Sequence, residues 1–195
     1  METQTFVFFG IIGSGKGTQV KRLMEYLKSK DSKESLYIGT GEEFRKLINS
    51  ESYTASRVKE IILKGELQPD FLTTSLFTNI LIHSLNEDKH LFADGYPRTV
   101  RQSESFDAIM KFFKHDKVKI IYIKISEEEA IRRNSLRGRH DDTKEGIAKR
   151  IEEYRNSVIP AMDYFKGKEG YEIYTINGEQ SREDVFKDII KALKF

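Results

Sequence analysis

The feature that most constrains the fold is a glycine-rich loop between an apolar run and an amphipathic pattern. The apolar run Thr5–Phe9 predicts a buried strand, and a helical pattern covers Gly15–Ser29. The residues between them read Gly10-Ile11-Ile12-Gly13-Ser14-Gly15-Lys16-Gly17-Thr18. Glycines let the backbone N–H groups turn toward phosphates, a helix N-terminus adds the positive end of a dipole, and the lysine reaches the β- and γ-phosphates. The sequence therefore predicts a triphosphate-binding loop in a strand–loop–helix unit.

The position after the lysine departs from the general phosphate-loop pattern. That pattern places Ser or Thr directly after the Lys, whereas here Gly17 follows Lys16 and Thr18 comes next. A glycine-rich turn with an unrelated lysine is the alternative, but strand, spacing, lysine and helix all occur together here. The predicted phosphate ligands are Gly13, Ser14, Gly15, Lys16, Gly17 and Thr18.

Short apolar runs alternate with helical patterns along the rest of the chain. Strands are expected at Thr5–Phe9, Leu36–Ile38, His90–Asp94, Val118–Ile125 and Glu172–Ile176. Helices are expected at Gly15–Ser29, Phe71–Leu85, Val100–Phe113, Glu127–Leu136, Lys144–Phe165 and, after Ser181 as N-cap, Arg182–Leu193. This alternation predicts an α/β fold with a five-stranded parallel sheet and helices on both faces. Ligands of such sheets bind beyond the carboxyl ends of the strands, so the residues after each strand are the functional candidates.

Two further strand ends carry residues suited to phosphate and metal. The second strand leads into Thr40-Gly41-Glu42-Glu43-Phe44-Arg45, which alone predicts a helix start with Thr40 as its cap. The third ends in Ala93-Asp94-Gly95-Tyr96-Pro97-Arg98-Thr99-Val100-Arg101-Gln102. An acid at a strand end beside a phosphate loop can hold the water shell of Mg²⁺, which makes Asp94 the candidate metal residue. The planar guanidinium of an arginine can hold two phosphate oxygens at once.

The segment Arg132-Arg133-Asn134-Ser135-Leu136-Arg137-Gly138-Arg139-His140-Asp141-Asp142 is rich in arginine. On a helix, Arg133 and Arg137 share a face, and their charges repel unless an anion lies between them. A solvated basic face is the usual interpretation of such a run. A phosphate-binding array is the alternative, because an anion between the arginines would relieve this repulsion.

Taken together, these segments resemble the adenylate kinase family, from Phe6 to about Leu193. The loop ends in the family's Gly-Lys-Gly-Thr-Gln, and the later segments are similar to its Thr-Gly-Asp-x-x-Arg and Asp-Gly-Phe-Pro-Arg-Thr-x-x-Gln. This chain differs in having Ile12 where the family usually has proline, Glu42 for Asp and Tyr96 for Phe. The resemblance implies a P-loop NTPase-type fold and in-line phosphoryl transfer from ATP·Mg²⁺ to AMP, giving two ADP.

The resemblance also implies roles for individual residues. The ATP side would comprise the phosphate loop with Arg133, Arg137 and Gln180. The AMP side would comprise Thr40, Gly41, Arg45, Gln68, Gly95, Arg98, Gln102, Arg139 and Arg150, with Asp94 holding Mg²⁺ through water. Charge on the moving phosphoryl group would be stabilised by Lys16, Arg98, Arg133, Arg137, Arg139 and Arg150, while Asp141 and Asp142 pair with arginines as a lid closes.

The resemblance divides the chain into one kinase domain with two small inserts. The core would comprise residues 1–38, 71–136 and 143–195, with a helical monophosphate-binding insert at about 39–70 and a lid at about 137–142. Only Gly138-Arg139-His140 separate the second lid arginine from the Asp pair, so the lid is unusually short. We expect incomplete exclusion of water, measurable as more ATP hydrolysis without AMP than in a longer-lid relative. With no cysteine in the chain, zinc of the kind that longer lids can hold is not expected.

Composition narrows the choice of partners. The formal net charge is +2, with 33 Lys and Arg against 31 Asp and Glu, whereas nucleic-acid binders usually carry a clear basic excess. The start of the sequence has no basic n-region, and no apolar stretch is long enough to cross a membrane. We therefore expect a cytoplasmic protein with ATP and AMP as partners, without nucleic acid or membrane, and a monomer by default.

Two alternatives stay open at this stage. The same chemistry could act on UMP, CMP or another monophosphate, a choice that Glu42 favours and that Thr40 and the Thr99–Gln102 stretch oppose. A nucleotide-binding regulator with weak turnover is the alternative of another class, motivated by Ile12 and the short lid.

Overall fold

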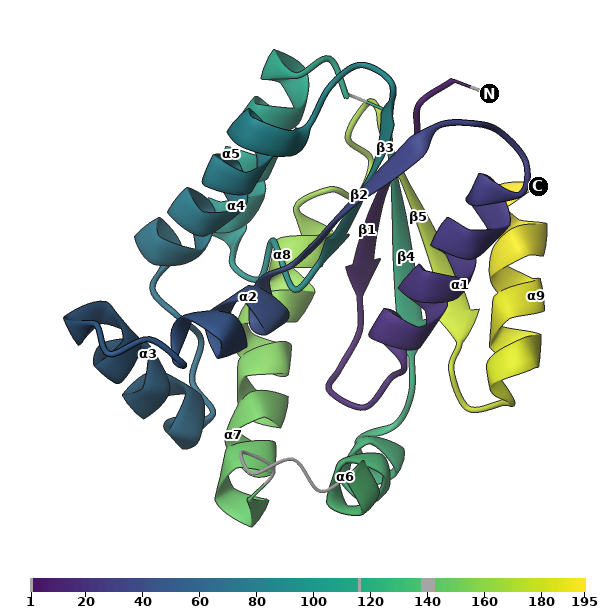
Figure 1. Cartoon of the computed structure of the whole chain (residues 1–195). Coiled ribbons are helices and arrows are strands. Elements are labelled where there is room, and N and C mark those ends of the chain that lie inside the picture. The colour runs from purple at the N-terminus through teal and green to yellow at the C-terminus, as the bar shows by residue number, and fades with distance from the viewer. Residues whose placement is uncertain (1, 116, 138–142) are drawn as a thin grey trace.

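The computed structural model describes residues 2–115, 117–137 and 143–195 as a sheet with helices on both faces (Figure 1). The strands are β1 (Thr5–Phe9), β2 (Glu34–Gly39), β3 (Lys89–Asp94), β4 (Val118–Lys124) and β5 (Tyr171–Asn177). They form one five-stranded sheet in the order β2-β3-β1-β4-β5, and every neighbouring pair is parallel. The predicted sheet is thus confirmed, with β2 longer at both ends than the Leu36–Ile38 that was predicted.

The described helices are α1 (Lys16–Lys28), α2 (Thr40–Leu47), α3 (Tyr53–Lys64), α4 (Asp70–Ser84), α5 (Val100–Phe112), α6 (Glu127–Arg137), α7 (Lys144–Glu153), α8 (Ile159–Asp163) and α9 (Arg182–Leu193). Helices α4, α5 and α8 lie on one side of the sheet, and α1 and α9 on the other (Figure 1). Helices α2 and α3 extend away from the sheet, beyond its carboxyl edge.

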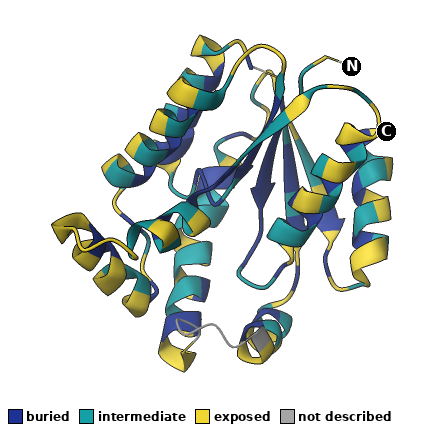
Figure 2. Cartoon of the chain, viewed as in Figure 1, coloured by how far each residue is buried: buried dark blue, intermediate teal, exposed yellow. Residues whose placement is uncertain are grey.

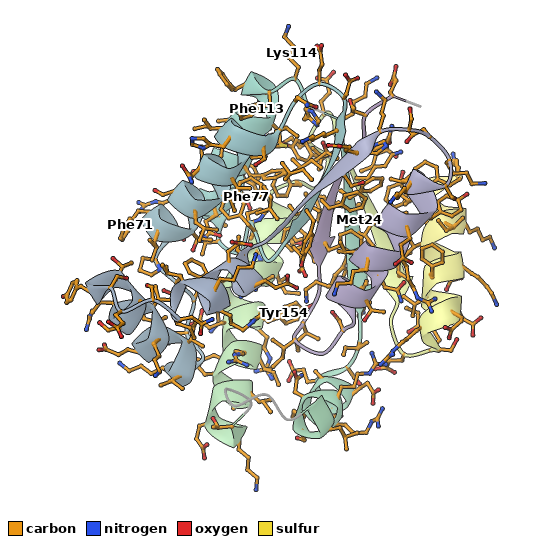
Figure 3. All side chains as sticks on the ribbon, in the orientation of Figure 1. Met24, Phe71, Phe77, Phe113, Lys114 and Tyr154 are labelled. Atoms are coloured by element: carbon orange, nitrogen blue, oxygen red, sulfur yellow. The ribbon has the colours of Figure 1, made fainter. Side chains whose placement is uncertain are left out.

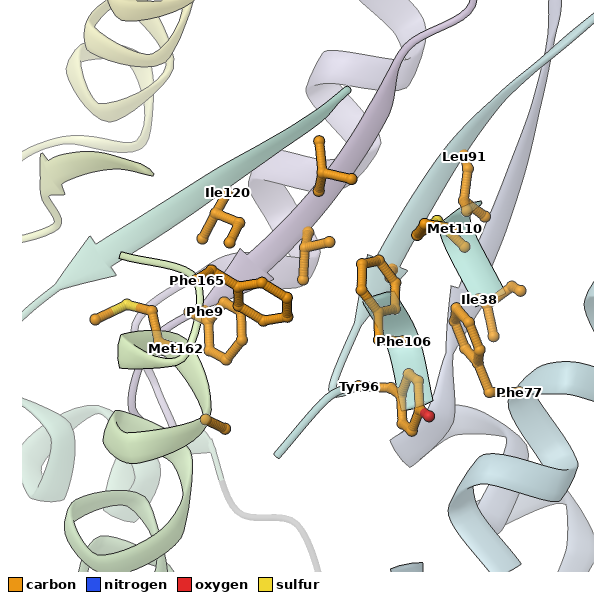
Figure 4. Close-up of a cluster of buried hydrophobic side chains, with 14 of the residues drawn as sticks. Phe9, Ile38, Phe77, Leu91, Tyr96, Phe106, Met110, Ile120, Met162 and Phe165 are labelled. Atoms are coloured by element: carbon orange, nitrogen blue, oxygen red, sulfur yellow. The ribbon is translucent and has the colours of Figure 1, made fainter. Parts of the chain in front are cut away.

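The three central strands β1, β3 and β4 are largely buried because helices cover both faces of the sheet, whereas the edge strands β2 and β5 are more exposed (Figure 2). On the face of α4, α5 and α8, Val7 and Phe9 contact a cluster that includes Phe77, Phe106 and Phe165 (Figure 4). On the face of α1 and α9, the alternate strand residues pack against another cluster, with Phe6, Phe8, Phe92, Val20, Leu23 and Ile189 among its members. Full burial of such a side chain contributes roughly 1.5–3 kcal/mol, so the two clusters fix the sheet between its helices.

The single helix expected at Lys144–Phe165 is wrong in detail. Helix α7 ends at Glu153, a π-helical turn covers Tyr154–Val158, and α8 follows. Pro160, in the first turn of α8, has no N–H to donate to the carbonyl four residues earlier, so regular α-helical bonding cannot continue there. The wide turn lies beside the phosphate loop, where Tyr154 packs against Ile11 and its neighbours (Figure 3).

Candidate functional site

A cleft of about 950 Å³ opens at the carboxyl edge of the sheet. Its walls come from the loop after β1, the start of α2 after β2, the residues that follow β3, and the turn after β5. Helices α6 and α7 add further basic side chains to the cleft, and α7 lies next to α3 (Figure 1). The cleft therefore lies where the fold class predicts a ligand site.

The phosphate loop adopts a conformation that requires glycine at two points. Gly13 and Gly15 have φ of +78° and +94°, in the left-handed region that other residues rarely adopt. A Cβ on Gly13 would also lie 2.6 Å from Asn134 Nδ2 of α6. Gly15 precedes α1 without capping the helix through a side chain, so the first N–H groups of α1 are open to an anion.

Lys16 is held over its own loop. Its Nζ donates to Gly10 O at 2.7 Å and to Ile11 O at 3.1 Å, with Ser14 Oγ at 3.4 Å. These neutral acceptors hold the ammonium group in the cleft beside the loop. A phosphate oxygen there would offer a charge-assisted bond in place of these contacts.

Asp94 ends β3 and faces the start of α1. Residue Gly39 of β2 lies next to it in the sheet, and a Cβ on Gly17 would lie 3.9 Å from its Oδ2. Close packing of protein around the carboxyl raises the pKa of Asp94, while the charges of Lys16 and Arg98 oppose that shift. A cation bound here together with phosphate would favour the ionised form of the Asp94 carboxyl.

Three arginines from different elements line the second half of the cleft. Arg45 comes from α2, Arg98 from the segment after β3, and Arg150 from α7. Desolvation lowers the pKa of Arg98, the charges of Arg150 and Arg45 lower it further, and Asp94 opposes them. Like charges gathered in this way indicate a site for a multiply charged anion.

Gly95 allows the arginine group to approach the start of α2. Its φ is +82°, and a Cβ there would lie 2.8 Å from both Arg98 Nη2 and Thr40 Oγ1. The expectation that Thr40 caps α2 is wrong: Gly39 is the N-cap, and the Thr40 hydroxyl donates to Gly95 O at 2.7 Å. The hydroxyl ties the two strand ends together, because Gly95 immediately follows the end of β3.

Two glutamine amides line the same half of the cleft. Gln102 Nε2 donates to Asp70 Oδ1 at 2.9 Å, and its Oε1 accepts from the backbone N–H of Arg98 at 2.8 Å. Gln68 Nε2 donates to Val58 O at 3.1 Å, whereas Gln68 Oε1 is buried with no hydrogen-bond partner. Both amides are therefore held in one orientation, and Gln68 keeps an unused acceptor.

Arg133 joins the phosphate loop to the turn after β5. Its Nη2 donates to Gly178 O at 2.9 Å and its Nη1 to Gly13 O at 3.4 Å. Glu129, four residues earlier on α6, accepts from Arg133 Nε at 2.6 Å. Hydrogen bonds from Arg132 and Arg133 lower the pKa of Glu129 to about 2. Gln180 lines this half too, but its amide donates to Asn177 O and Asp188.

The cleft thus brings together most of the predicted residues. The phosphate loop from Gly13 to Thr18 lines it, and so do Thr40, Gly41, Arg45, Gln68, Asp94, Gly95, Arg98, Gln102, Arg133, Arg150 and Gln180. Arg139, Asp141 and Asp142 lie outside the described residues, and of Arg137 only its place at the end of α6 is described.

Sequence reasoning missed three residues that organise this cleft. Asp70 holds Gln102 and also accepts from Thr99 Oγ1 at 2.9 Å, and Glu129 holds Arg133. The spacing of Glu129 and Arg133, four residues apart on a helix, was the available indication of that pair. Tyr37 also lines the cleft, and nothing in its sequence context indicates this.

Within the described residues, no three or more His, Cys, Asp or Glu side chains are grouped so that they could hold a metal ion alone. In the same part of the chain, none of the helices combines the length and apolar character needed to cross a bilayer.

Comparison with known proteins agrees with this geometry. A family model described as "Adenylate kinase" matches residues 8–170. The chain is 33% identical to the adenylate kinase of Bacteroides fragilis, over 96% of each chain. It is 30% identical to that of Thermosipho africanus, over 96% of this chain and 98% of the relative. It is also 34% identical to that of Prochlorococcus marinus, over 82% of this chain and 83% of the relative.

Proposed function

This chain belongs to the adenylate kinase family of nucleoside monophosphate phosphotransferases, and on that premise we propose how its cleft moves the terminal phosphoryl group of ATP onto AMP. The observation that carries the proposal is that one cleft holds both a phosphate loop and a separate group of three arginines. Two anions can therefore bind end to end, with Lys16 and Asp94 between them. Two ADP molecules result, and the reaction is reversible.

ATP occupies the half formed by the phosphate loop. Loop N–H groups and Lys16 bind the β- and γ-phosphates, and Lys16 exchanges its carbonyl partners for phosphate oxygens. Arg133 already spans Gly13 O and Gly178 O, so it lies between the phosphate loop and the turn with Gln180. That turn is the proposed contact for the adenine of ATP.

AMP occupies the half lined by arginines. Its phosphate binds Arg45, Arg98 and Arg150, whose mutual repulsion falls when a dianion lies among them. The base lies against Thr40, Gln68 and Gln102, with the glycine backbone at positions 41 and 95 allowing close approach. The unused acceptor of Gln68 suits the exocyclic amine of adenine, which favours AMP over 6-oxopurine monophosphates.

The carboxylates at the cleft floor fit magnesium bound through water. Mg²⁺ usually keeps several waters and binds through one or two carboxylates together with substrate phosphates. Asp94 and Glu42 both line the cleft, and Glu42 is among the charges that raise the pKa of Asp94. Bound there, the ion would neutralise negative charge on the β- and γ-phosphates.

Phosphoryl transfer needs little covalent chemistry from the protein. Charge spreads over the oxygens of the moving group, and fixed cations in a site poor in water stabilise it. Lys16, Arg98, Arg133 and Arg150 all line the cleft, and we assign this role to them. Roles for Arg137, Arg139, Asp141 and Asp142 stay predictions, as do the short lid and the division into core and inserts. So do the cytoplasmic location and the monomer.

The acceptor is tested by measuring initial rates of diphosphate formation from ATP·Mg²⁺ with AMP, UMP, CMP or GMP. Lys16→Ala is the blank, because loss of one positioned cation typically costs about 10²–10³ in rate. We expect rapid turnover with AMP and little with the others. Preference for a pyrimidine monophosphate would overturn the acceptor assignment. Tight ATP binding without turnover on any acceptor would instead favour a nucleotide-binding regulator.

A further inference from the structure

Tyr37 projects into the cleft from a strand through space that a glycine leaves free. Residues 37 and 39 of β2 point to the same face of the sheet, because side chains alternate along a strand. A Cβ on Gly39 would lie 2.3 Å from Tyr37 Oη and 2.7 Å from its Cζ. The phenol ring therefore lies along the strand, and its hydroxyl is over Gly39 at the carboxyl edge of the sheet.

The hydroxyl of Tyr37 lies close to two carboxylates. It donates to Glu42 Oε1 at 3.3 Å, and Glu42 is in the first turn of α2. Gly39, which the hydroxyl covers, is the direct neighbour of Asp94 across the sheet. A carboxylate oxygen can only accept a hydrogen bond, so the phenol hydroxyl is the donor to Glu42.

We propose that Tyr37 is a positioning residue for magnesium, whose hydroxyl holds the Glu42 carboxylate beside Asp94 so that both acids can accept hydrogen bonds from metal-bound water. The inference rests on the proposed function, because it assumes that Asp94 faces the metal. Tyr37 lies outside both the phosphate loop and the group of three arginines. Tyr37 acts through Glu42 rather than on the substrate.

The glutamate at position 42 explains why a hydrogen-bond donor is needed here. Glutamate has one more rotatable bond than aspartate, so its carboxylate is less fixed unless a partner holds it. Outer hydrogen-bond partners of metal-binding groups commonly set the orientation of those groups. The three residues form a set, since Gly39 provides the space, Tyr37 the donor and Glu42 the carboxylate.

Binding of manganese as a probe for magnesium tests this directly. Free Mn²⁺ is followed by electron paramagnetic resonance while it is titrated into the complex of the protein with diadenosine pentaphosphate. For Tyr37→Phe we expect Mn²⁺ affinity to fall about tenfold, at the low end for loss of an outer partner. Affinity for diadenosine pentaphosphate measured without metal should stay within about twofold of wild type, because the proposed role of the phenol is exerted through Glu42 and the metal.

A matched control is available on β5. The Tyr174 hydroxyl donates to Glu172 in the same way, outside the residues that line the cleft. Tyr174→Phe removes an equivalent tyrosine–glutamate hydrogen bond and should leave Mn²⁺ affinity unchanged. Gly39→Ala should reproduce the loss seen for Tyr37→Phe, because its Cβ displaces the phenol.

The outcomes separate this inference from the proposed function. If Asp94→Asn weakens Mn²⁺ binding but Tyr37→Phe does not, Tyr37 has no positioning role and only this inference is overturned. If Asp94→Asn also leaves Mn²⁺ affinity unchanged, the proposed metal site itself is wrong. A loss of metal-free diadenosine pentaphosphate affinity in Tyr37→Phe would show a nucleotide contact or a structural role instead, and would also overturn the inference.

Discussion

At the level of single residues, ionisation of the Asp94 carboxyl in the cleft affects the stability of the fold. Asp94 as a residue is partly exposed in the cleft, yet burial of its carboxyl raises the pKa of that group despite the nearby charges of Lys16 and Arg98. A raised folded-state pKa means that ionisation costs stability. That cost is absent below the ordinary pKa of an aspartate, grows as pH rises through the raised pKa, and is constant above it.

Asp94→Asn should therefore stabilise the fold while reducing transfer. At pH 7 we expect a higher free energy of unfolding than in wild type, with the difference shrinking as pH falls toward the ordinary aspartate range. Phosphoryl transfer should fall on the order of 10²-fold, because the proposed metal contact is lost. Urea unfolding of both proteins between pH 4 and pH 8, with transfer rates at pH 7, measures both effects. A difference in stability independent of pH would contradict the account.

Gln68 allows the choice of base to be tested at one atom. Its amide is fixed through Val58 O, which leaves Oε1 as a buried acceptor without a partner. Gln68→Leu should raise the KM for AMP about tenfold and reduce discrimination against IMP, whose 6-oxo group cannot donate. Purine riboside monophosphate lacks any 6-substituent and should serve wild type and variant equally well. Unchanged discrimination between AMP and IMP would remove Gln68 from base recognition.

At the scale of elements, a small hydrophobic cluster connects the phosphate loop to the arginine-bearing helices. Ile11 of the loop packs with Ala130 of α6 and with Ile147 and Ile151 of α7, and Ile12 packs against this cluster. The isoleucine at position 12 thus has a packing partner that compensates for a less rigid turn. The cluster holds the loop against the same helix that carries Arg150.

Ile147→Ala should affect both stability and ATP binding. Removing the buried side chain leaves a cavity and should cost about 3 kcal/mol of unfolding free energy. The loop should also lose its support, so the KM for ATP should rise more than the KM for AMP. Ile189→Ala is the matched control, because Ile189 is equally buried in the cluster under α1 and α9. It should cost similar stability without changing the ratio of the two KM values, and an equal change in both variants would refute the coupling.

Much of the element pattern could be predicted because apolar periodicity sets it directly. The strand runs around Phe6, Phe92 and Ile121 are covered on both faces, and each was found where its apolar residues indicated. The π-helical turn was not predicted, because its position depends on how Tyr154 packs against Ile11 of the phosphate loop. Helix α3 was not predicted individually within the insert.

Some features of the candidate site could likewise be predicted from the sequence, and others could not. Asp94 ends β3 and Lys16 begins the helix after the neighbouring strand β1, so their approach to one another follows from the parallel sheet. The hydrogen bond of Thr40 to Gly95 O, the unused acceptor of Gln68 and the position of Tyr37 over Gly39 each depend on contacts between distant segments. Such contacts have no local pattern in the sequence.

On the scale of the whole molecule, the cleft unites segments from nearly the full length of the chain, from the phosphate loop to the start of α9. A ligand that fills both halves should therefore stabilise the fold more than one that fills a single half. Binding to the folded state alone adds about 2.7 kcal/mol when the ligand is present at 100 times its Kd.

Thermal unfolding can test whether the two halves form one bisubstrate site. We expect diadenosine pentaphosphate to raise the Tm more than ATP or AMP alone at the same concentration. Arg98→Met should reduce the shifts caused by diadenosine pentaphosphate and by AMP, while the shift caused by ATP serves as the internal control and stays the same. If the dinucleotide shifted the Tm no more than ATP does, and Arg98→Met did not alter that shift, the arginine-lined half would not be a nucleotide site.

The central claim, direct transfer between two nucleotides in one cleft, is tested most directly by following the label of [γ-³²P]ATP during the first turnovers with AMP and Mg²⁺. We predict that the label appears in the β-phosphate of ADP, that its appearance requires AMP, and that Lys16→Ala slows it by about 10²–10³-fold. Label recovered only in inorganic phosphate, or retained in ATP while AMP is present, would contradict the account.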